Sequence, residues 1–356
     1  MKWILVGLAS LVSLAASAPL NKRASFAAVR PPAVPLAVRQ PYLSTWSFAD
    51  SIVGNWPEFW TGGQIKGWSA FARVDGKAYP IMGNPGQDPI GSAGNAAQTS
   101  LTITPTKSIY VMQAGAVKVT MTFLSPVEPQ SPQLQSIPLS YLQIQAQSTD
   151  GNSHSVQIMV DISAEWANAY ATQQAQWTVD SSVNVNGGTL QTFTVQSTTQ
   201  TEFSENNQYP NWGTAIWSIL NANGLTWQSG DNAATMRTSF VSNGKLANTN
   251  NANFRAINNG YPIFGFAHDL GNIGGNASPV LTYVIGHVRP RSITWQGNPV
   301  NAYWMNFWSN WQGLLQFFYN DLPNAISRNN YLDASISNAA TSANGGNYEA
   351  IVALAV

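Results

Sequence analysis

Three runs in which apolar and polar residues largely alternate limit the fold more than any other feature of this sequence. They occupy residues 117–123, 142–147 and 156–162. Alternation with a period of two places one side of a strand against a core and the other side in water. Further strand-like segments occupy residues 190–195, 214–220, 263–267 and 280–288. The pattern predicts a mainly β protein.

The connections between these segments predict how the strands assemble. They are rich in Gly and Asn, and no helical pattern lies between them. This favours an antiparallel β-sandwich over a parallel α/β sheet. The tight-turn sequence Thr149-Asp150-Gly151-Asn152 separates two of the alternating runs, so we expect residues 142–147 and 156–162 to pair as a hairpin.

The N-terminus has the pattern of a signal peptide over residues 1–18. A basic Met1-Lys2 precedes an apolar run, and Ala16-Ser17-Ala18 supplies small residues for cleavage. The apolar run is shorter than the roughly 20 residues of a membrane-spanning helix. We therefore expect a secreted, extracellular protein. Lys22-Arg23 is either a processing site or a pair of solvated charges. Residues 19–41 are Pro-rich and predict a propeptide or linker that lies extended on the surface.

Charge and cysteine content exclude several classes of function. Lys and Arg together number 16, and so do Asp and Glu, so no basic excess exists to attract nucleic acid or an anionic membrane. We expect neither as a partner. The sequence has no Cys, which excludes disulfides, thiol nucleophiles and Cys-ligated zinc. Its 14 Trp, 12 Tyr and 14 Phe supply a core instead. Asn276 starts a glycosylation sequon whose use stays open.

The periodicity changes over residues 299–356. Apolar residues recur at spacings of three and four between residues 304 and 319, which predicts a helix that ends near Pro323. A second helical stretch is expected from about Leu332 to Val356. Its last residues are apolar and lack a capping glycine or a polar tail. We expect the chain to stop within a structural element and this tail to be exposed; the alternative is that it packs back on the sandwich.

Two carboxylates form the first candidate for a catalytic pair. Asp161 and Glu165 flank the end of a predicted strand, beside Trp166. Glycoside hydrolysis uses two such groups as acid and base or nucleophile. The alternative is that both carboxylates form structural hydrogen bonds, and the spacing alone favours this interpretation.

The three histidines give no catalytic set. His268 and Asp269 are neighbours on a strand, so their side chains point to opposite faces. His287 lies within a strand and is expected to be structural, whereas His154 lies at a turn and is expected to be exposed. Metal-ligand spacings, phosphate-binding loops and a Gly-x-Ser-x-Gly motif are missing from the sequence. We therefore assign no catalytic, cofactor-binding or metal-binding residue and expect no cofactor.

An aromatic cluster over residues 56–68 has two interpretations. It contains Trp56, Phe59, Trp60 and Trp68. Large aromatic side chains dominate protein cores, which favours burial. Alternatively, Trp60 and Trp68 form an exposed platform on which sugar rings stack, which would make the sandwich a carbohydrate-binding module.

Seven short segments of the sequence are informative when they are taken in their order along the chain. They are Arg30-Pro31-Pro32-Ala33-Val34-Pro35, Pro41-Tyr42-Leu43-Ser44-Thr45-Trp46, Gly67-Trp68-Ser69, Asp161-Ile162-Ser163-Ala164-Glu165-Trp166, Trp212-Gly213-Thr214-Ala215, Phe264-Gly265-Phe266-Ala267-His268-Asp269 and Ile285-Gly286-His287-Val288-Arg289. In this order they resemble the secreted fungal glutaminase A family over residues 30–356. The resemblance implies a β-sandwich followed by a helical linker and an α/α-barrel, and hydrolysis of L-glutamine to L-glutamate and ammonia.

Combined with the patterns above, the resemblance gives a domain layout. Residues 42–298 form the sandwich, and residues 299–356 form the helical linker and the start of a truncated α/α-barrel. The first hypothesis is a non-catalytic N-terminal part of a glutaminase A-like amidohydrolase, whose partner is its own missing barrel. The second is a carbohydrate-binding module of a glycoside hydrolase-like extracellular enzyme.

Overall fold

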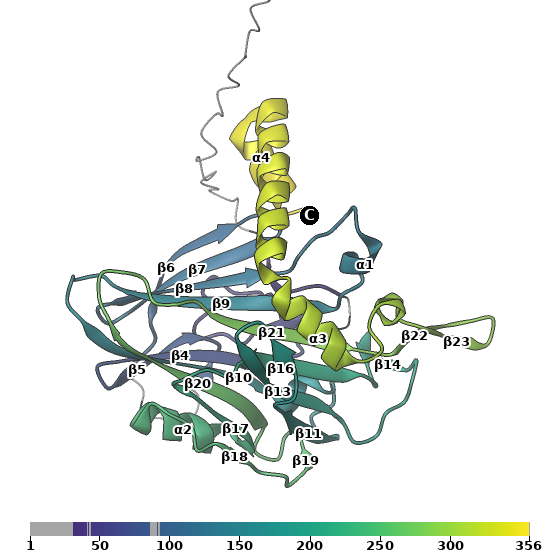
Figure 1. Ribbon diagram of the computed structural model, residues 1–356, viewed down its shortest axis with the longest axis horizontal. Helices are drawn as coiled ribbons and strands as arrows, with labels where there is room; N and C mark the ends of the chain where they lie inside the picture. Colours follow the sequence, from purple (N-terminus) through teal and green to yellow (C-terminus); the bar gives the residue numbers. More distant parts are fainter. Residues whose placement is uncertain (1–30, 41, 43, 86–90, 92, 356) are drawn as a thin grey trace, which may run out of the picture.

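The computed structural model describes residues 31–40, 42, 44–85, 91 and 93–355. The expected signal peptide and Lys22-Arg23 lie outside these residues. Two large sheets of mostly antiparallel strands face each other, with helices on their outer sides (Figure 1). The predicted class, a mainly β sandwich with a C-terminal helical segment, is confirmed. Among the described residues, no helix combines the length and apolarity needed to cross a membrane.

The smaller of the two main sheets has six strands. Their order is β18 (Thr249–Asn250), β17 (Leu225–Asn232), β20 (Pro262–Ile273), β10 (His154–Ser163), β4 (Trp68–Val74) and β5 (Lys77–Met82). The helix α2 (Ala233–Asn243) packs on its outer face through a separate apolar cluster that includes Met236 and Phe240. The sequence prediction missed this helix.

The larger sheet is assembled from ten strands. Nine follow one path: β19 (Arg255–Ala256), β11 (Gln174–Asp180), β13 (Gly188–Ser197), β16 (Thr214–Leu220), β21 (Leu281–Val288), β9 (Leu139–Ser148), β8 (Val117–Leu124), β7 (Lys107–Ala114) and β6 (Ala97–Ile103). The short β12 (Asn184–Val185) pairs with β13 beside this path. Every segment that the sequence predicted as a strand lies within one of the strands of the two main sheets.

The predicted hairpin between residues 142–147 and 156–162 is wrong. Strand β9 pairs with β8 and β21 in the larger sheet, whereas β10 pairs with β4 and β20 in the smaller one. The turn at residues 149–153 therefore carries the chain from one sheet to the other. Both strands turn their apolar side toward the same core, from opposite sides of it.

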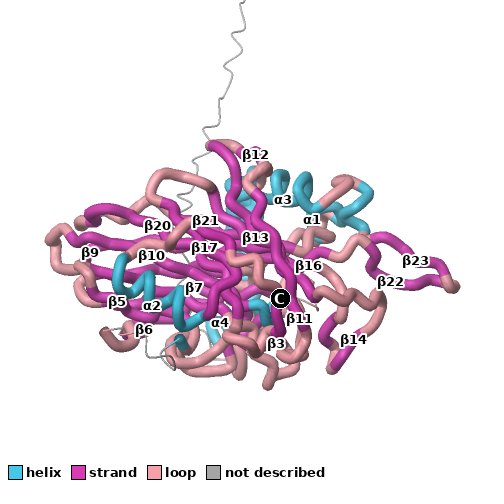
Figure 2. The backbone as a smooth tube through the Cα atoms, turned by 90° about the horizontal axis from the view of Figure 1, so that it is seen from below, coloured by secondary structure: helices cyan, strands magenta, loops and turns pink. Residues whose placement is uncertain are grey.

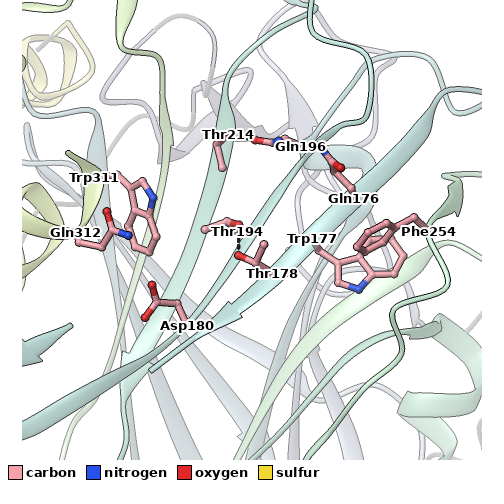
Figure 3. A pocket seen from close by; sticks show the side chains of 10 residues that line it. All are labelled: Gln176, Trp177, Thr178, Asp180, Thr194, Gln196, Thr214, Phe254, Trp311 and Gln312. Carbon is pink, nitrogen blue, oxygen red and sulfur yellow. Dashed lines mark hydrogen bonds between the residues drawn. The ribbon is translucent and has the colours of Figure 1, made fainter. Parts of the chain in front are cut away.

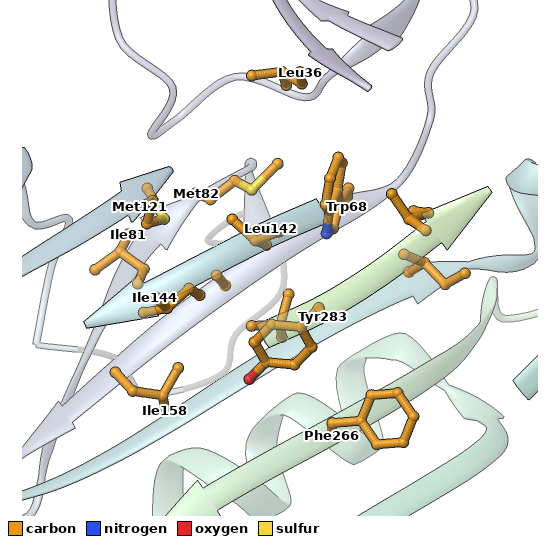
Figure 4. Packing of buried hydrophobic residues seen from close by; sticks show 14 of the residues in the cluster. Leu36, Trp68, Ile81, Met82, Met121, Leu142, Ile144, Ile158, Phe266 and Tyr283 are labelled. Carbon is orange, nitrogen blue, oxygen red and sulfur yellow. The ribbon is translucent and has the colours of Figure 1, made fainter. Parts of the chain in front are cut away.

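The main core fills the space between the two sheets and includes many aromatic rings (Figure 4). Trp68 of the smaller sheet meets Phe123 and Trp217 of the larger sheet edge to face, at ring-centroid distances of 5.4 and 6.0 Å. Trp217 in turn stacks on Tyr283 at 5.1 Å. Aromatic contacts of this kind add to the free energy gained from burial, and they join the two sheets into one unit.

A three-stranded sheet near the N-terminus corrects one expectation about the Pro-rich segment. It consists of β1 (Val34–Ala37), β2 (Thr45–Ser47) and β3 (Glu58–Phe59). Val34, Leu36 and Ala37 are buried in the main core. This part of the Pro-rich segment is therefore a buried strand and not a surface linker, because its apolar residues find a place at the side of the sandwich.

Two hairpins and a short helix complete the irregular parts of the sandwich. The hairpins pair β14 (Glu205–Asn206) with β15 (Tyr209–Pro210) and β22 (Arg291–Trp295) with β23 (Asn298–Asn301). Hairpin β22–β23 extends away from the body of the molecule (Figures 1 and 2). The helix α1 (Pro132–Gln135) is capped by the Ser131 side chain.

The C-terminal helical segment begins with a 3-10 turn at Tyr303–Asn306, followed by α3 (Trp311–Asn320) and α4 (Leu322–Ala353). The predicted helix over residues 304–319 is thus interrupted before Asn310, whose side chain caps α3. Helix α3 does end ahead of Pro323, as expected. However, α4 begins directly after it and not near Leu332, because proline fits the first turn of a helix.

Helix α4 breaks at Asn344 and Gly345, where Gly345 has a φ of +72° that favours glycine. Beyond this point the chain turns back, and Glu349 accepts hydrogen bonds from Ser337 and Thr341 on the first part of the helix. Ile351 is exposed as expected, whereas Ala350 and Ala353 are buried. The tail therefore packs back in part.

Candidate functional site

Asp161 is held in a buried ion pair. It lies on β10, and its Oδ1 and Oδ2 accept hydrogen bonds from Arg237 of α2 at 2.7 and 3.2 Å. Ser69 of β4 donates a third hydrogen bond at 2.7 Å. Both charged side chains are almost fully buried. A carboxylate that is already neutralised and desolvated in this way is a structural anchor between α2 and the smaller sheet.

Glu165 lies at the end of β10 in a different environment. Its Oε2 accepts a hydrogen bond of 2.7 Å from Ser163, and burial raises its pKa. Lys66 is fully buried nearby and donates to the hydroxyl of Tyr209, which itself donates to the backbone carbonyl of Glu165 at 2.9 Å. Burial lowers the pKa of Lys66 well below its ordinary value. The two candidate carboxylates thus accept hydrogen bonds from different side chains, although Arg237 also acts electrostatically on Glu165.

His287 and Arg289 continue this polar cluster at the same end of the sandwich. The His287 ring is fully buried, and neither of its nitrogens has a hydrogen-bond partner among the described residues. Burial and the neighbouring Arg289 hold its pKa well below 6.5. The guanidinium of Arg289 stacks on Tyr42 and Trp212, at 3.9 and 4.8 Å from the ring centroids. His287 is therefore a buried residue of strand β21, as the sequence indicated, but within the described part of the chain its ring lacks the hydrogen bonds expected of a structural histidine.

The other two histidines lie on strands of the smaller sheet. His154 is not simply exposed, because its ring nitrogens contact Asp75 at 2.6 Å and Asp150 at 3.0 Å. These contacts join two turns of the sandwich. His268 and Asp269 are successive residues of β20, and Asp269 accepts from Gln157 at 3.2 Å and from its own turn at Gly271. Asp269 therefore has partners other than His268.

The aromatic cluster of residues 56–68 does not form a flat sugar-binding platform. Trp68 has 0% of its surface exposed and Phe59 is equally buried, whereas Trp60 is 43% exposed. Trp60 therefore has no coplanar exposed partner in Trp68. The burial of these rings fits the interpretation of the cluster as part of the core.

A cleft of about 420 Å³ lies on the outer face of the larger sheet (Figure 3). Strands β11, β13 and β16 form its floor, with Trp311 and Gln312 of α3 on one side and Phe254 on the other. The floor carries hydroxyl and amide groups, and Thr178 and Thr194 are hydrogen-bonded at 2.6 Å. Its volume lies within the range of small-molecule sites, and its lining is both polar and aromatic. The sequence patterns did not indicate it, because its residues come from segments far apart in the chain.

The helical segment is fixed to the larger sheet by a second set of polar contacts. Asp333 of α4 accepts hydrogen bonds from the backbone and hydroxyl of Thr106 and from Lys107, whose Nζ lies 2.6 Å away. Tyr141 stacks on Phe318 of α3 at 4.0 Å and donates to its carbonyl at 2.5 Å. Helices α3 and α4 therefore leave the sandwich in a defined direction.

Sequence reasoning missed the partners in these clusters. Arg237 lies on α2, and the signal that would have found this helix is the spacing of Ala233, Met236, Phe240 and Val241 between Asn232 and the C-cap Gly244. Lys66 gives no local signal, because its burial depends on Tyr209, which is 143 residues away.

The fold and these clusters define a β-sandwich domain that has internally paired charges and a rigidly attached helical segment. The chain belongs to the family described as "Domain of unknown function (DUF5127)", whose model matches residues 106–339. A second model, "Domain of unknown function (DUF4964)", matches residues 8–88.

Two curated relatives carry the name that the sequence resemblance indicated. A glutaminase A of Aspergillus oryzae is 36% identical over 364 residues, which cover 99% of this chain and 50% of that protein. A protein of Arthroderma benhamiae named "Probable glutaminase" is 29% identical, covering 89% of this chain and 39% of its own length. The similarity to glutaminase A is therefore confirmed, and the chain spans about half the length or less of these relatives.

Among solved structures, a "Putative kojibiose phosphorylase from human microbiome" superposes with a TM-score of 0.33 and 9% identity over 72% of this chain and 29% of its own. A TM-score this low supports no conclusion about the fold or the function of this chain.

Proposed function

We propose that this chain is the N-terminal, non-catalytic part of a secreted amidohydrolase that converts L-glutamine to L-glutamate and ammonia. The observation that carries this proposal is the 36% identity to glutaminase A over 99% of the chain, which corresponds to 50% of that protein. The reacting groups then belong to the part of the relatives that this chain does not match. Export rests on the pattern of residues 1–18, and N-terminal sequencing of the exported protein tests it.

Three of the buried carboxylates are held in ion pairs, which supports a non-catalytic role for them. Asp161 is paired with Arg237, Asp333 with Lys107, and Glu128 with Arg328 at 2.9 Å. A general acid or base must exchange protons with a substrate within hydrogen-bond reach. These carboxylates instead hold secondary-structure elements together.

The contacts of the helical segment support a bracing role. Helices α3 and α4 are held to the larger sheet by Tyr141, Glu128 and the Thr106–Lys107 turn. A segment held at several points transmits a fixed orientation to whatever follows it in the chain. We propose that the sandwich braces a helical catalytic domain in this way.

Ammonia release from L-glutamine tests the proposal. We expect the purified 356-residue chain to release no ammonia above the buffer blank in an assay coupled to glutamate dehydrogenase. The glutaminase A of Aspergillus oryzae, measured in parallel, shows that the assay works. Glutamine-dependent ammonia release that co-purifies with the chain would refute the non-catalytic assignment.

A further inference from the structure

The cleft on the outer face of the larger sheet has a floor ordered by the register of three strands. Gln176 of β11 faces Gln196 of β13, and Gln196 accepts a 2.7 Å hydrogen bond from Thr214 of β16. One step along the strands, Thr178 faces Thr194. Because alternate residues of a strand share a face, these side chains form two parallel rows of polar groups. The rows offer both donors and acceptors of hydrogen bonds.

Aromatic rings form the two sides of this floor. Trp311 stands at the start of α3 on one side, and Phe254 stands on the other (Figure 3). Phe254 is 37% exposed and is held in place by an edge-to-face contact with the buried Trp177 at 4.9 Å. The face of an aromatic ring carries partial negative charge and attracts the C–H groups of a ligand. The cleft therefore combines apolar sides with a polar floor.

The charges of the lining narrow the class of ligand. The ten lining residues include no Lys, Arg or His, and Asp180 is the only ionisable side chain among them. Oδ1 of Asp180 accepts two hydrogen bonds from Ser182, at 2.6 and 2.7 Å. Such a cleft has no cation to neutralise a phosphate, a carboxylate or a free amino acid's α-carboxylate. It suits a neutral ligand with many hydroxyls.

We propose that this cleft binds a neutral glycan, by stacking a sugar ring on Trp311 or Phe254 and by hydrogen-bonding its hydroxyls to the threonine and glutamine rows. A sugar ring has an apolar face of C–H groups and a polar rim, which matches this arrangement of sides and floor. The volume of about 420 Å³ lies within the range of sites for small ligands. The proposal does not depend on the proposed amidohydrolase function, because it rests on the lining of the cleft.

Calorimetric titration of the full chain tests the proposal. The probes are the neutral hexaoses of β-1,4-glucan, β-1,3-glucan, mannan and chitin, with hexagalacturonate as the charged counterpart. We expect at least one neutral hexaose to bind with a dissociation constant of about 1 mM or below, and hexagalacturonate to bind more weakly. Trp311→Ala and Phe254→Ala should each weaken the neutral ligand by about tenfold or more, whereas Trp311→Phe should restore most of the affinity.

Trp295→Ala is the matched control, because Trp295 is 64% exposed on hairpin β22–β23 and lies outside the cleft. It should leave the affinity unchanged. Circular dichroism and the melting temperature establish that each variant is folded, and Phe254→Ala remains informative if Trp311→Ala disturbs the start of α3. Binding of none of the four neutral hexaoses at about 5 mM would overturn the proposal. So would a neutral hexaose whose affinity in both Trp311→Ala and Phe254→Ala is unchanged from that of the unmodified protein.

Discussion

At the scale of single residues, this protein places several of its few charged side chains inside the fold. Charged residues make up only 9% of the chain, yet Asp161, Arg237 and Lys66 are all buried. Transfer of an ion out of water is costly, so a buried charge persists only where a partner compensates it. Arg237 compensates Asp161, whereas the Tyr209 hydroxyl and the Glu165 carboxyl compensate Lys66 only in part, because burial still lowers the pKa of that lysine.

Asp161→Asn tests the importance of the buried ion pair. We expect it to lower the free energy of unfolding by about 3–5 kcal/mol, because it removes the negative charge from a buried guanidinium. The control Glu202→Gln breaks the exposed pair between Glu202 and Arg291 and should cost less than about 1 kcal/mol. Urea unfolding measures both. Equal losses in the two variants would contradict a structural role for Asp161.

His287 should make the protein sensitive to acid. Its folded-state pKa is held well below 6.5 by burial, so below about pH 6.5 the unfolded chain binds a proton that the folded protein does not. The free energy of unfolding then falls with decreasing pH, by up to about 1.4 kcal/mol per pH unit. Urea unfolding between about pH 7 and pH 5 should therefore show a smaller loss in His287→Gln than in the unmodified protein.

His154 supplies the control with the opposite sign. Hydrogen bonds to Asp150 and Asp75 raise its pKa, so its contribution to stability is present below its unfolded-state pKa and is lost as the pH rises. His154→Gln should therefore steepen the loss of stability in acid. Identical pH dependence in both variants would show that these histidines do not govern it.

The residue patterns predicted part of these sites. The apolar neighbours of His287 predicted its burial, whereas strand alternation placed Asp161 on the water-facing side of β10, where the structure buries it against Arg237. This partner was not predicted, since Arg237 lies 76 residues from Asp161 and local patterns say nothing about contacts at that separation. His154 was expected to be exposed because it lies at a turn, and its contact with Asp75 was missed because Asp75 lies 79 residues away on another turn.

At the scale of elements, strand alternation determines which face of a strand is buried but not which strand it pairs with. The alternating runs in β9 and β10 were predicted correctly as strands, yet their pairing was wrong. In a sandwich, two successive strands that face the same core have two possible arrangements. They can be neighbours in one sheet, or they can lie in different sheets on opposite sides of the core. The same apolar pattern and a similar short turn satisfy both arrangements.

Asp333→Asn tests how α4 is attached to the sandwich. Asp333 is the side chain through which α4 contacts Thr104, Thr106 and Lys107, so the substitution should weaken this attachment by about 1.5–3 kcal/mol. Amide hydrogens of α4 should exchange faster while those of the central strand β21 keep their protection. The exposed Asn330→Ala on the same helix is the control. Unchanged exchange in Asp333→Asn would show that other contacts hold the helix.

At the scale of the whole molecule, the prediction of a mainly β sandwich succeeded because it needs only the total pattern. Many alternating segments and a large supply of aromatic residues require two apolar sheet faces in contact. The position of Val34–Ala37 was not predictable in this way. A short Pro-containing segment adopts the same extended conformation whether it lies on the surface or is buried at the side of a core. Which of the two applies depends on the space that the sheets leave open.

Trp68 gives the strongest test of whether the two sheets form one cooperative unit. It lies on the smaller sheet and contacts Phe123 and Trp217 of the larger one. Trp68→Ala should lower the free energy of unfolding by about 3–5 kcal/mol, because it opens a cavity between the sheets. Both sheets contribute to that cavity. The far-UV and near-UV circular dichroism of the Trp68→Ala variant should therefore still change in one coincident thermal transition.

Trp60→Ala is the control for this experiment, since Trp60 is 43% exposed and lies outside the main core. It should change the free energy of unfolding by less than about 0.5 kcal/mol. Two separate transitions in Trp68→Ala would mean that each sheet folds with its own helix, through the apolar clusters beneath α2 and α3. A single transition at reduced stability would mean that the aromatic contacts between the sheets hold the sandwich together, and that the attached helices are braced by the whole molecule.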